Sequence, residues 1–377
     1  MKYIRDIKNL NGVKVLMCAD FNVPVKDGVI VDNFRLRKIT PTILFLRERG
    51  AKIILIGHIE TPKEHPTLEP VVKYFDNHDI KCTLIKNYRN AYEEIERMKN
   101  GDTVMLENIR EHPEEKQNDD NFAKQLASLA DLYINEAFSV SHRAHVSVSA
   151  ITKFLPSYAG LLFEKEIENL NSVFKPEHPF LFILGGAKFD TKLPLIEKFI
   201  NIADKLFIGG ALANNFFKES GIEIGKSVVS PMNFNLSRFF NNKKLFFPID
   251  GVLSMDKKSL KNIGELRPED TMYDAGPKTV EILEREIMNA KHILWNGPLG
   301  IYENGFKEPT QSIAKAIARV TAGGARSILG GGDTLATLSD LNMEREFTFI
   351  STGGGAMLEY LAKGTLPGVE ALENSLI

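Results

Sequence analysis

The chain has 377 residues, which is more than one hydrophobic core usually organises, so two domains are expected. Its 47 basic and 49 acidic residues nearly balance, which argues against binding to nucleic acid or to an anionic membrane surface. No apolar run reaches the ~18 residues that a membrane-spanning helix needs, and the N-terminus lacks the apolar stretch of a signal peptide. We therefore expect a cytoplasmic protein in which Cys18 and Cys82 are free thiols.

The first half of the chain alternates short apolar runs with amphipathic segments. The apolar runs are bounded by turn or polar residues, and this pattern is typical of buried strands. Two intervening segments, residues 34–48 and 121–130, have the periodicity of helices. The runs predicted as strands are residues 13–18, 51–56, 103–106 and 132–135.

A single predicted helix separates the two halves. It covers residues 163–174, with Leu170 and Phe174 on its apolar side. The prolines at positions 176 and 179 end it, because proline cannot continue a helix. One helix that links two α/β lobes suggests a hinge.

The alternation of strands and helices resumes in the second half. This order predicts the α/β class, with two doubly wound parallel-sheet lobes of the Rossmann-like kind joined by the hinge helix. Ligands bind such sheets at the carboxyl ends of the strands. The strands predicted in this half are residues 179–184, 205–208, 244–249, 292–295, 325–329 and 348–351.

Glycines follow four of these strands, at residues 185–186, 209–210, 330–332 and 353–355. Each cluster precedes a helical segment, and such a turn lets backbone N–H groups and a helix N-terminus approach an anion. One turn of this kind is weak support, but four along one edge of a sheet favour a phosphate site. The Walker P-loop is absent, because residues 221–227 are one residue too short and are expected to form a loop.

Charged residues accompany these glycines. Lys188 and Lys192 are four positions apart, so they share a helix face if the segment is helical, although two solvated lysines would look the same. Asp333 follows the glycine triplet at a predicted helix start. It could cap that helix or bind Mg²⁺, which uses one or two carboxylates together with phosphate oxygens.

Polar side chains in the first half also follow the predicted strands. Arginine binds carboxylates and phosphates in a bidentate manner, so arginines and histidines along one sheet edge predict an anion site. The sequence thus predicts an anionic small molecule on one lobe and a nucleotide on the other, with hinge closure excluding water. The residues are Asp20, Asn22, Arg35, His58, Arg110, His142, Arg143 and His145.

Motifs along almost the whole chain resemble those of the phosphoglycerate kinase family. The motifs match the family in their residues and also in their order and spacing along the chain. The first lobe carries DFNVP at 20–24, NFR at 33–35, LENIR at 106–110 and HRAH at 142–145. The second carries GGAK at 185–188, GPKT at 276–279, WNGP at 295–298, GGDT at 331–334 and STGGGA at 351–356, and LPGV follows at 366–369.

The resemblance implies a reversible phosphoryl transfer between ATP or ADP and the carboxylate of 3-phosphoglycerate, as in glycolysis and gluconeogenesis. It implies direct in-line transfer in a closed cleft, without a covalent enzyme intermediate, in a monomer. It also implies an acceptor lobe at residues 1–162, a linker at 163–178, a nucleotide lobe at 179–363, and a tail at 364–377 that returns to the first lobe.

The same resemblance assigns roles to individual positions. The implied catalytic residues are Arg35, Lys188, Lys192, Gly354 and Gly355. The implied acceptor-binding residues are Asp20, Asn22, Arg35, His58, Arg110, His142 and Arg143. The implied nucleotide-binding residues are Gly186, Lys188, Lys192, Gly210, Asn296, Glu303, Gly331, Gly332, Asp333 and Thr334, and Asp333 would also hold Mg²⁺.

The chain departs from the family pattern in the acceptor lobe. Cys18 and Thr61 stand where the family usually has arginines, Glu60 replaces a glycine, and Glu111 replaces a phenylalanine. Losing one arginine–phosphate contact would weaken binding by roughly ten- to a hundredfold. Three hypotheses follow: a phosphoglycerate kinase that tolerates these changes, an ATP-dependent kinase that forms an acyl phosphate on a different carboxylate, and a non-catalytic binding protein of the same fold.

Overall fold

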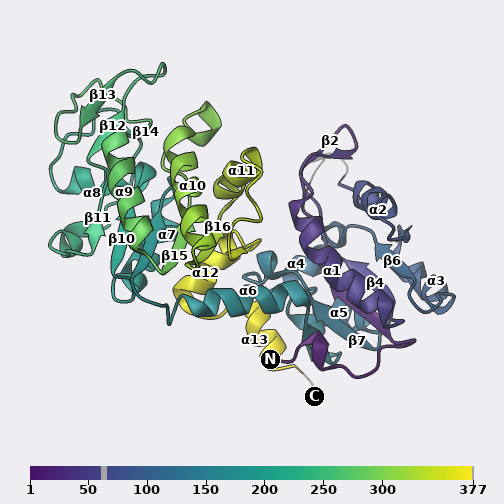
Figure 1. The fold of residues 1–377 in the computed structure, drawn as a ribbon. Helices are drawn as coiled ribbons and strands as arrows, with labels where there is room; N and C mark the ends of the chain where they lie inside the picture. Colours follow the sequence, from purple (N-terminus) through teal and green to yellow (C-terminus); the bar gives the residue numbers. More distant parts are fainter. Residues whose placement is uncertain (61–65, 376–377) are drawn as a thin grey trace. The chain divides into compact units, whose positions relative to one another are not determined.

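The computed structural model describes residues 1–60 and 66–375 (Figure 1). Its residue contacts divide the chain into two compact units. Unit 1 consists of Met1–Glu168 and Lys363–Ile377, and unit 2 consists of Asn169–Ala362. Helix α6 (Leu161–Ser172) crosses the boundary between them. The predicted helix at 163–174 therefore exists but begins and ends two residues earlier in the chain.

A six-stranded parallel sheet forms the centre of unit 1, in the order β5-β6-β4-β1-β7-β8. Four of the five residues of β1 and of β4 are buried, as expected for strands covered on both faces. The strands are β1 (Lys14–Cys18), β4 (Lys52–Ile56), β5 (Cys82–Ile85), β6 (Thr103–Leu106), β7 (Leu132–Asn135) and β8 (Ser157–Ala159), and β2 (Val25–Lys26) and β3 (Val29–Ile30) form a separate hairpin.

Helices cover this sheet through apolar stripes. In α1 the buried residues Leu36, Ile39, Ile43 and Leu46 recur at spacings of three and four, which places them on one face. The helices of unit 1 are α1 (Phe34–Glu48), α2 (Glu69–Asp76), α3 (Ala91–Glu96), α4 (Pro113–Gln117), α5 (Asp120–Ala127) and α13 (Pro367–Glu373).

Both ends of unit 1 pack on its edge strand β8. Tyr3 forms a parallel bridge with Ala159, and the amide of Ala159 donates to the carbonyl of Lys2 at 2.9 Å. Helix α13 also contacts β8, and the hydroxyl of Ser375 donates to the carbonyl of Ser157 at 3.5 Å. The last described residues therefore complete the unit in which the chain begins.

Unit 2 contains a second six-stranded parallel sheet, in the order β11-β10-β9-β15-β16-β17. Its strands are β9 (Phe180–Leu184), β10 (Lys205–Ile208), β11 (Leu245–Phe246), β15 (His292–Asn296), β16 (Arg326–Gly330) and β17 (Phe349–Ile350). Its helices are α7 (Phe189–Phe199), α8 (Gly210–Glu219), α9 (Pro277–Asn289), α10 (Glu308–Ala322), α11 (Gly332–Asp340) and α12 (Gly355–Lys363). A small antiparallel sheet, β13-β12-β14, consists of β12 (Asp250–Val252), β13 (Leu260–Asn262) and β14 (Asp274–Ala275).

The predicted fold class, two parallel-sheet lobes of the α/β type, is confirmed. Helix 34–48 and strands 103–106, 132–135 and 205–208 have the predicted bounds. The prediction for 244–249 was wrong in extent, because β11 covers only two residues and β12 begins at Asp250. Strands β5 and β8 and the antiparallel sheet were not predicted.

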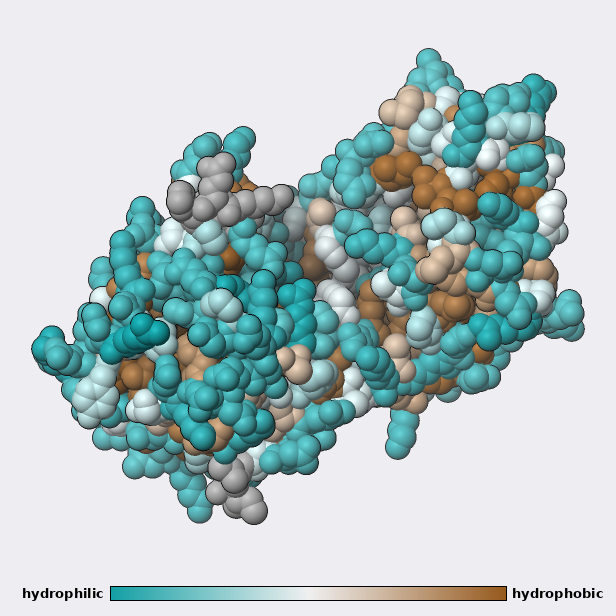
Figure 2. All heavy atoms as spheres, turned by 180° about the vertical axis from the view of Figure 1, so that it is seen from behind, coloured by the Kyte–Doolittle hydropathy of each residue, from teal (hydrophilic) through white to brown (hydrophobic). Residues whose placement is uncertain are grey.

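The surface in Figure 2 is mostly hydrophilic, with hydrophobic patches that are more extensive on unit 2, at the right of that view. Exposed apolar side chains of unit 2 include Val228, Ile249 and Leu260. Within residues 1–60 and 66–375, no helix has the length and apolar character needed to cross a membrane. Cys18 and Cys82 are free thiols, as predicted, and both are buried.

Candidate active site

The four glycine clusters of unit 2 lie together at one edge of its sheet. They follow β9, β10, β16 and β17, which run parallel, so the carboxyl ends of these strands point the same way. Helices α8, α11 and α12 begin at these turns with Gly210, Gly332 and Gly355. This edge therefore presents backbone N–H groups and helix N-termini, which together favour an anion.

Two of these glycines allow an approach that a side chain would block. Gly210 has a φ of +58°, and a Cβ there would lie 2.7 Å from the backbone nitrogen of Gly186. Gly186 has a φ of +89°, and a Cβ there would lie 2.7 Å from Nζ of Lys192. The turns at residues 185–186 and 209–210 therefore pack against each other, and Nζ of Lys192 lies next to Gly186.

The predicted lysine pair is split between two environments. Lys188 precedes the first residue of α7 and is exposed, so it does not share a helix face with Lys192. Lys192 lies inside α7, is only 7% exposed, and donates from Nζ to the carbonyl of Gly185. Burial lowers the pKa of Lys192 to about 8, while Asp333 acts in the opposite direction. A phosphate bound beside Lys192 would raise this pKa again, because a nearby negative charge favours the charged ammonium.

Asp333 does not cap its helix. Gly331 is the N-cap of α11, and Asp333 lies in the first turn with an exposed carboxylate. The neighbouring residues Asn296 and Thr334 are buried and already bonded: Nδ2 of Asn296 donates to Gly330, and Oγ1 of Thr334 accepts from Gly297 at 2.9 Å. These two residues hold the turns in place, whereas Asp333 remains available to a ligand.

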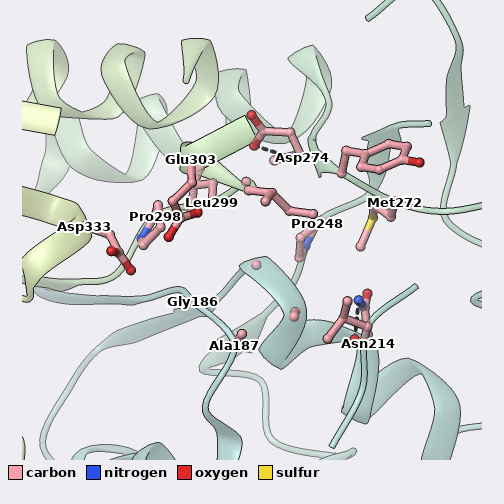
Figure 3. A pocket seen from close by; sticks show the side chains of 17 residues that line it. Gly186, Ala187, Asn214, Pro248, Met272, Asp274, Pro298, Leu299, Glu303 and Asp333 are labelled. Carbon is pink, nitrogen blue, oxygen red and sulfur yellow. Dashed lines mark hydrogen bonds between the residues drawn. The ribbon is translucent and has the colours of Figure 1, made fainter. Parts of the chain in front are cut away.

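A cavity of about 240 Å³ opens beside these turns (Figure 3). Of the residues predicted from the sequence, Gly186, Gly210, Glu303 and Asp333 line it. Glu303 belongs to the short helix η7 (Tyr302–Asn304). The remaining lining residues include several that sequence analysis missed, among them Asn214, Val228, Pro248, Met272, Tyr273 and Asp274.

Asp274 is a buried carboxyl in the wall of this cavity. Its Oδ1 accepts from the amide of Ala275 at 2.8 Å, and the group lies against Gly300, where a Cβ would be 2.2 Å from its Cγ. Burial raises the pKa of Asp274 to about 8. The side chain is therefore mainly neutral at pH 7 and forms part of the packing between β14 and the loop before η7.

In unit 1 the side chain of Arg35, near the start of α1, is held by the loop after β1. Its Nη1 lies 3.1 Å from Oδ2 of Asp20 and donates to the carbonyl of Asn22 at 2.8 Å. Asp20 is buried and also accepts from the hydroxyl of Ser139, a contact that the sequence did not reveal. Oδ1 of Asn22 accepts from the amide of Glu60 at 3.1 Å, so the loops after β1 and β4 are joined.

His58, Arg110, Arg143 and His145 come together at the same edge. Burial, and next the charge of Arg110, lower the pKa of His58 to about 4. Burial, Arg110 and Arg143 lower the pKa of His145 to about 4 as well, and His145 is absent from the residues implied by the resemblance. Both imidazoles are therefore neutral at pH 7 and offer hydrogen bonds, while the two arginines supply the charge. His142 accepts from Nε of Arg143 at 3.2 Å.

Arg110 is backed by a buried carboxylate. Its side chain is 11% exposed, and its Nε lies 3.9 Å from Oε1 of Glu115, which is fully buried. Glu115 accepts from the amide and the hydroxyl of Ser147 at 2.9 and 2.7 Å. Cys18 lies in this buried region, and burial raises the pKa of its thiol to about 12. Cys18 is therefore a neutral packing residue at a position where the resemblance led us to expect an arginine.

The two glutamates that depart from the family pattern, Glu60 and Glu111, lie in different surroundings. Glu60 lies at the site, with Oε1 3.8 Å from Nε2 of His58, although its side chain is 61% exposed. Glu111 ends the short helix η3 (Ile109–Glu111) and is exposed, and its side chain has no ion pair with the described residues. Thr61 stands at the second position where the resemblance predicts an arginine, and it lies outside the described residues.

Comparison with known proteins identifies the family. The profile of the family described as phosphoglycerate kinase matches residues 4–364. A phosphoglycerate kinase from Dictyoglomus turgidum is 43% identical over 99% of each chain, and one from Fervidobacterium nodosum is 37% identical over 98% of this chain and 97% of the other. The solved structure of phosphoglycerate kinase from Coxiella burnetii superposes with a TM-score of 0.87, at 32% identity and 98% coverage of both chains. The chain belongs to the phosphoglycerate kinase family.

Proposed function

We propose that this protein catalyses reversible phosphoryl transfer between ATP or ADP and the carboxylate of 3-phosphoglycerate. As a family member it is an ATP-dependent phosphotransferase. The observation that carries the proposal is the glycine-lined edge of unit 2, with Lys192 behind it, in a chain whose relatives share its whole length. The comparisons do not support the alternative prediction of a different carboxylate acceptor.

Unit 2 would bind the nucleotide. Gly186 and Gly210 let the phosphates approach the turns, and Lys192 and Lys188 neutralise their charge. Backbone N–H groups of Gly354 and Gly355, at the start of α12, would stabilise the moving phosphoryl group. We propose that Gly331 and Gly332 bind phosphate through the backbone at the start of α11, while Asn296 and Thr334 position the turns. Glu303, on the cavity wall, would bind the ribose hydroxyls.

Mg²⁺ fits the donor set at this edge. Among the described residues no group of three or more His, Cys, Asp or Glu side chains could hold a metal ion by itself. A single exposed carboxylate, Asp333, lines the cavity beside the glycine turn. Mg²⁺ is commonly held by one or two carboxylates and by substrate phosphates, so Asp333 would bind it together with the nucleotide. The ion would neutralise phosphate charge.

Unit 1 would bind the acceptor. Arg110 and Arg143 supply positive charge, and neutral His58 supplies a hydrogen bond. Arg35 is oriented by Asp20 and Asn22, and we propose that it lies near the transferring group, with His142 supporting Arg143. Catalysis would consist of orienting the carboxylate and neutralising the phosphoryl charge, without a covalent enzyme intermediate. The hinge at residues 163–178, the monomeric state and the cytoplasmic location are part of this proposal.

The test is turnover of 3-phosphoglycerate with ATP and Mg²⁺, with the acyl phosphate trapped by hydroxylamine. We expect saturable turnover that is lost in Lys192→Met, and retained in Lys363→Met, which removes a lysine from unit 1 outside the proposed site. A protein that binds Mg-ATP but does not turn over 3-phosphoglycerate would contradict the assigned acceptor. Sedimentation at assay concentration would test the monomer.

A further inference from the structure

Asn108 lies between two segments that carry proposed acceptor-binding residues. It follows β6 and is the N-cap of η3, the short helix that contains Arg110. The segment after β4, which carries His58, runs beside it, since the amide of Ile109 donates to the carbonyl of Gly57 at 3.1 Å. Asn108 itself is only 1% exposed.

The side-chain amide of Asn108 uses its full hydrogen-bonding capacity. Its Nδ2 donates to the carbonyls of Ile59 and Pro66, at 2.9 and 3.3 Å. Its Oδ1 accepts from the backbone amides of Ile59 and Arg110, at 3.4 and 3.2 Å. A carboxamide has two N–H donors and an oxygen that accepts twice, so backbone groups occupy every position. The orientation is fixed, because a flipped amide would place its oxygen against two carbonyls.

These bonds join the segment of His58 to the segment of Arg110. Ile59 follows His58 directly and is held at both its amide and its carbonyl. The same oxygen of Asn108 also holds the amide of Arg110, so one atom fixes the distance between the two backbones. The side chains of His58 and Arg110 lie close enough that Arg110 contributes to lowering the pKa of His58.

The preceding residue, Glu107, holds a later part of the segment after β4. Its carboxylate accepts from the hydroxyl of Thr67 and from the amide of Leu68, both at 2.8 Å. These contacts fix the part that leads into α2, whereas Asn108 fixes the part next to His58. Loss of the Asn108 side chain would therefore release the part that carries His58 and leave the attachment near α2 in place.

We propose that Asn108 is a positioning residue for the acceptor, which holds His58 and Arg110 at the spacing that the anionic substrate needs and does not itself touch the substrate. The inference rests on the proposed function, in which these two residues bind 3-phosphoglycerate. A pair that is already ordered binds a ligand without the entropy cost of ordering it. Without Asn108 this cost would fall on substrate binding, while Arg35 and the residues of unit 2 would act as before.

The first experiment is steady-state kinetics of the full-length Asn108→Leu variant, which loses all four bonds at similar side-chain size. We expect the KM for 3-phosphoglycerate to rise about tenfold, as for the loss of one hydrogen bond of ordinary net strength, and kcat to change less than about threefold. The dissociation constant of ADP should keep its wild-type value, because the proposed nucleotide residues belong to unit 2. A lower melting temperature with an unchanged KM would show a purely structural role and overturn the inference.

The second experiment combines Asn108→Leu with Arg110→Met. The spacing of the pair no longer matters once one member is gone, so in the Arg110→Met background Asn108→Leu should raise the KM by less than about threefold. A general loss of stability would give no such coupling. A full tenfold increase in that background would overturn the inference.

Asn100 is the matched control. It lies before β6, at the other end of that strand, and its Nδ2 also tethers a distant segment by donating to Oδ1 of Asn11 at 2.9 Å. Asn100→Leu should keep the wild-type KM. A wild-type protein that binds ADP but does not turn over 3-phosphoglycerate would overturn the proposed function and this inference with it. Turnover by the wild type with an unchanged KM in Asn108→Leu would overturn this inference alone.

Discussion

Lys192 should make nucleotide affinity depend on pH. Lys192 is 7% exposed, and burial lowers its pKa to about 8. A bound nucleotide would place negative phosphates beside it and raise that pKa, because an opposite charge favours the ionised lysine. Binding above pH 8 must therefore be accompanied by uptake of a proton, and affinity falls as the pH rises.

The size of the effect follows from the fraction of charged lysine. With a pKa of about 8, roughly three quarters of the free protein is protonated at about pH 7.5, and only about 3% at about pH 9.5. If the bound form stays protonated throughout, the affinity for ADP should fall about 25-fold over this range, which is about 1.9 kcal/mol. The nucleotide's terminal phosphate has a second pKa of about 6, so it stays ionised throughout.

The assay is calorimetry with ADP at several pH values, in buffers of different ionisation enthalpy. The dependence on buffer gives the number of protons taken up, which should approach one above about pH 9. Lys192→Met should bind more weakly and show no such uptake. Asp274→Asn serves as a control, because Asp274 is the other cavity group whose pKa is about 8. Undiminished proton uptake in Lys192→Met would refute the reasoning.

Three further predictions concern other parts of the two sites. Gly210→Ala should lower the free energy of unfolding by about 2–4 kcal/mol, and with it the melting temperature and the ADP affinity, because its Cβ would meet backbone atoms. Gly221 also has a positive φ but faces open space, so Gly221→Ala should lower the free energy of unfolding by only about 1 kcal/mol. Glu60→Gln should lower the KM for 3-phosphoglycerate about two- to fivefold by removing an exposed negative charge, whereas Glu111→Gln should leave it unchanged; equal effects would contradict the placement of these carboxylates. Asp333→Asn should raise the Mg²⁺ concentration needed for half-maximal turnover at least tenfold, measured by metal titration, while metal-free ADP affinity should not fall.

Sequence periodicity located the central strands accurately and missed the two edge strands of the sheet in unit 1. Strands such as β6 are buried at every position, so they stand out as continuous apolar runs. β5 lies at the sheet edge and buries only its first and last residues, and β8 has only three residues, so neither gives that signal. The run at 244–249 looked continuous because a two-residue strand is followed at once by a proline-containing loop and then by β12.

The candidate sites show a similar division. Glycines at strand ends and paired cations could be predicted, because their residue types are unusual at those positions. Asn214, Met272 and Asp274 could not, because their importance comes from distant segments that meet around one cavity. Two adjacent polar residues, Asn214 and Asn215, interrupt an apolar stretch between Ala213 and Phe216, and this is the signal that could have drawn attention to Asn214.

The chain leaves unit 1 at Glu168 and re-enters it at Lys363, so unit 2 is an insertion within the sequence of unit 1. During synthesis, all of unit 2 is made before the residues that form α13. Unit 2 can therefore fold as an autonomous domain on the ribosome while unit 1 still lacks the helix that packs on β8. ADP in the cell would then stabilise the inserted domain before the parent domain is complete. Tyr3 and α13 both lie on β8. A circular permutant that joins the two ends of the chain should therefore separate the folding of unit 2 from the completion of unit 1 by α13.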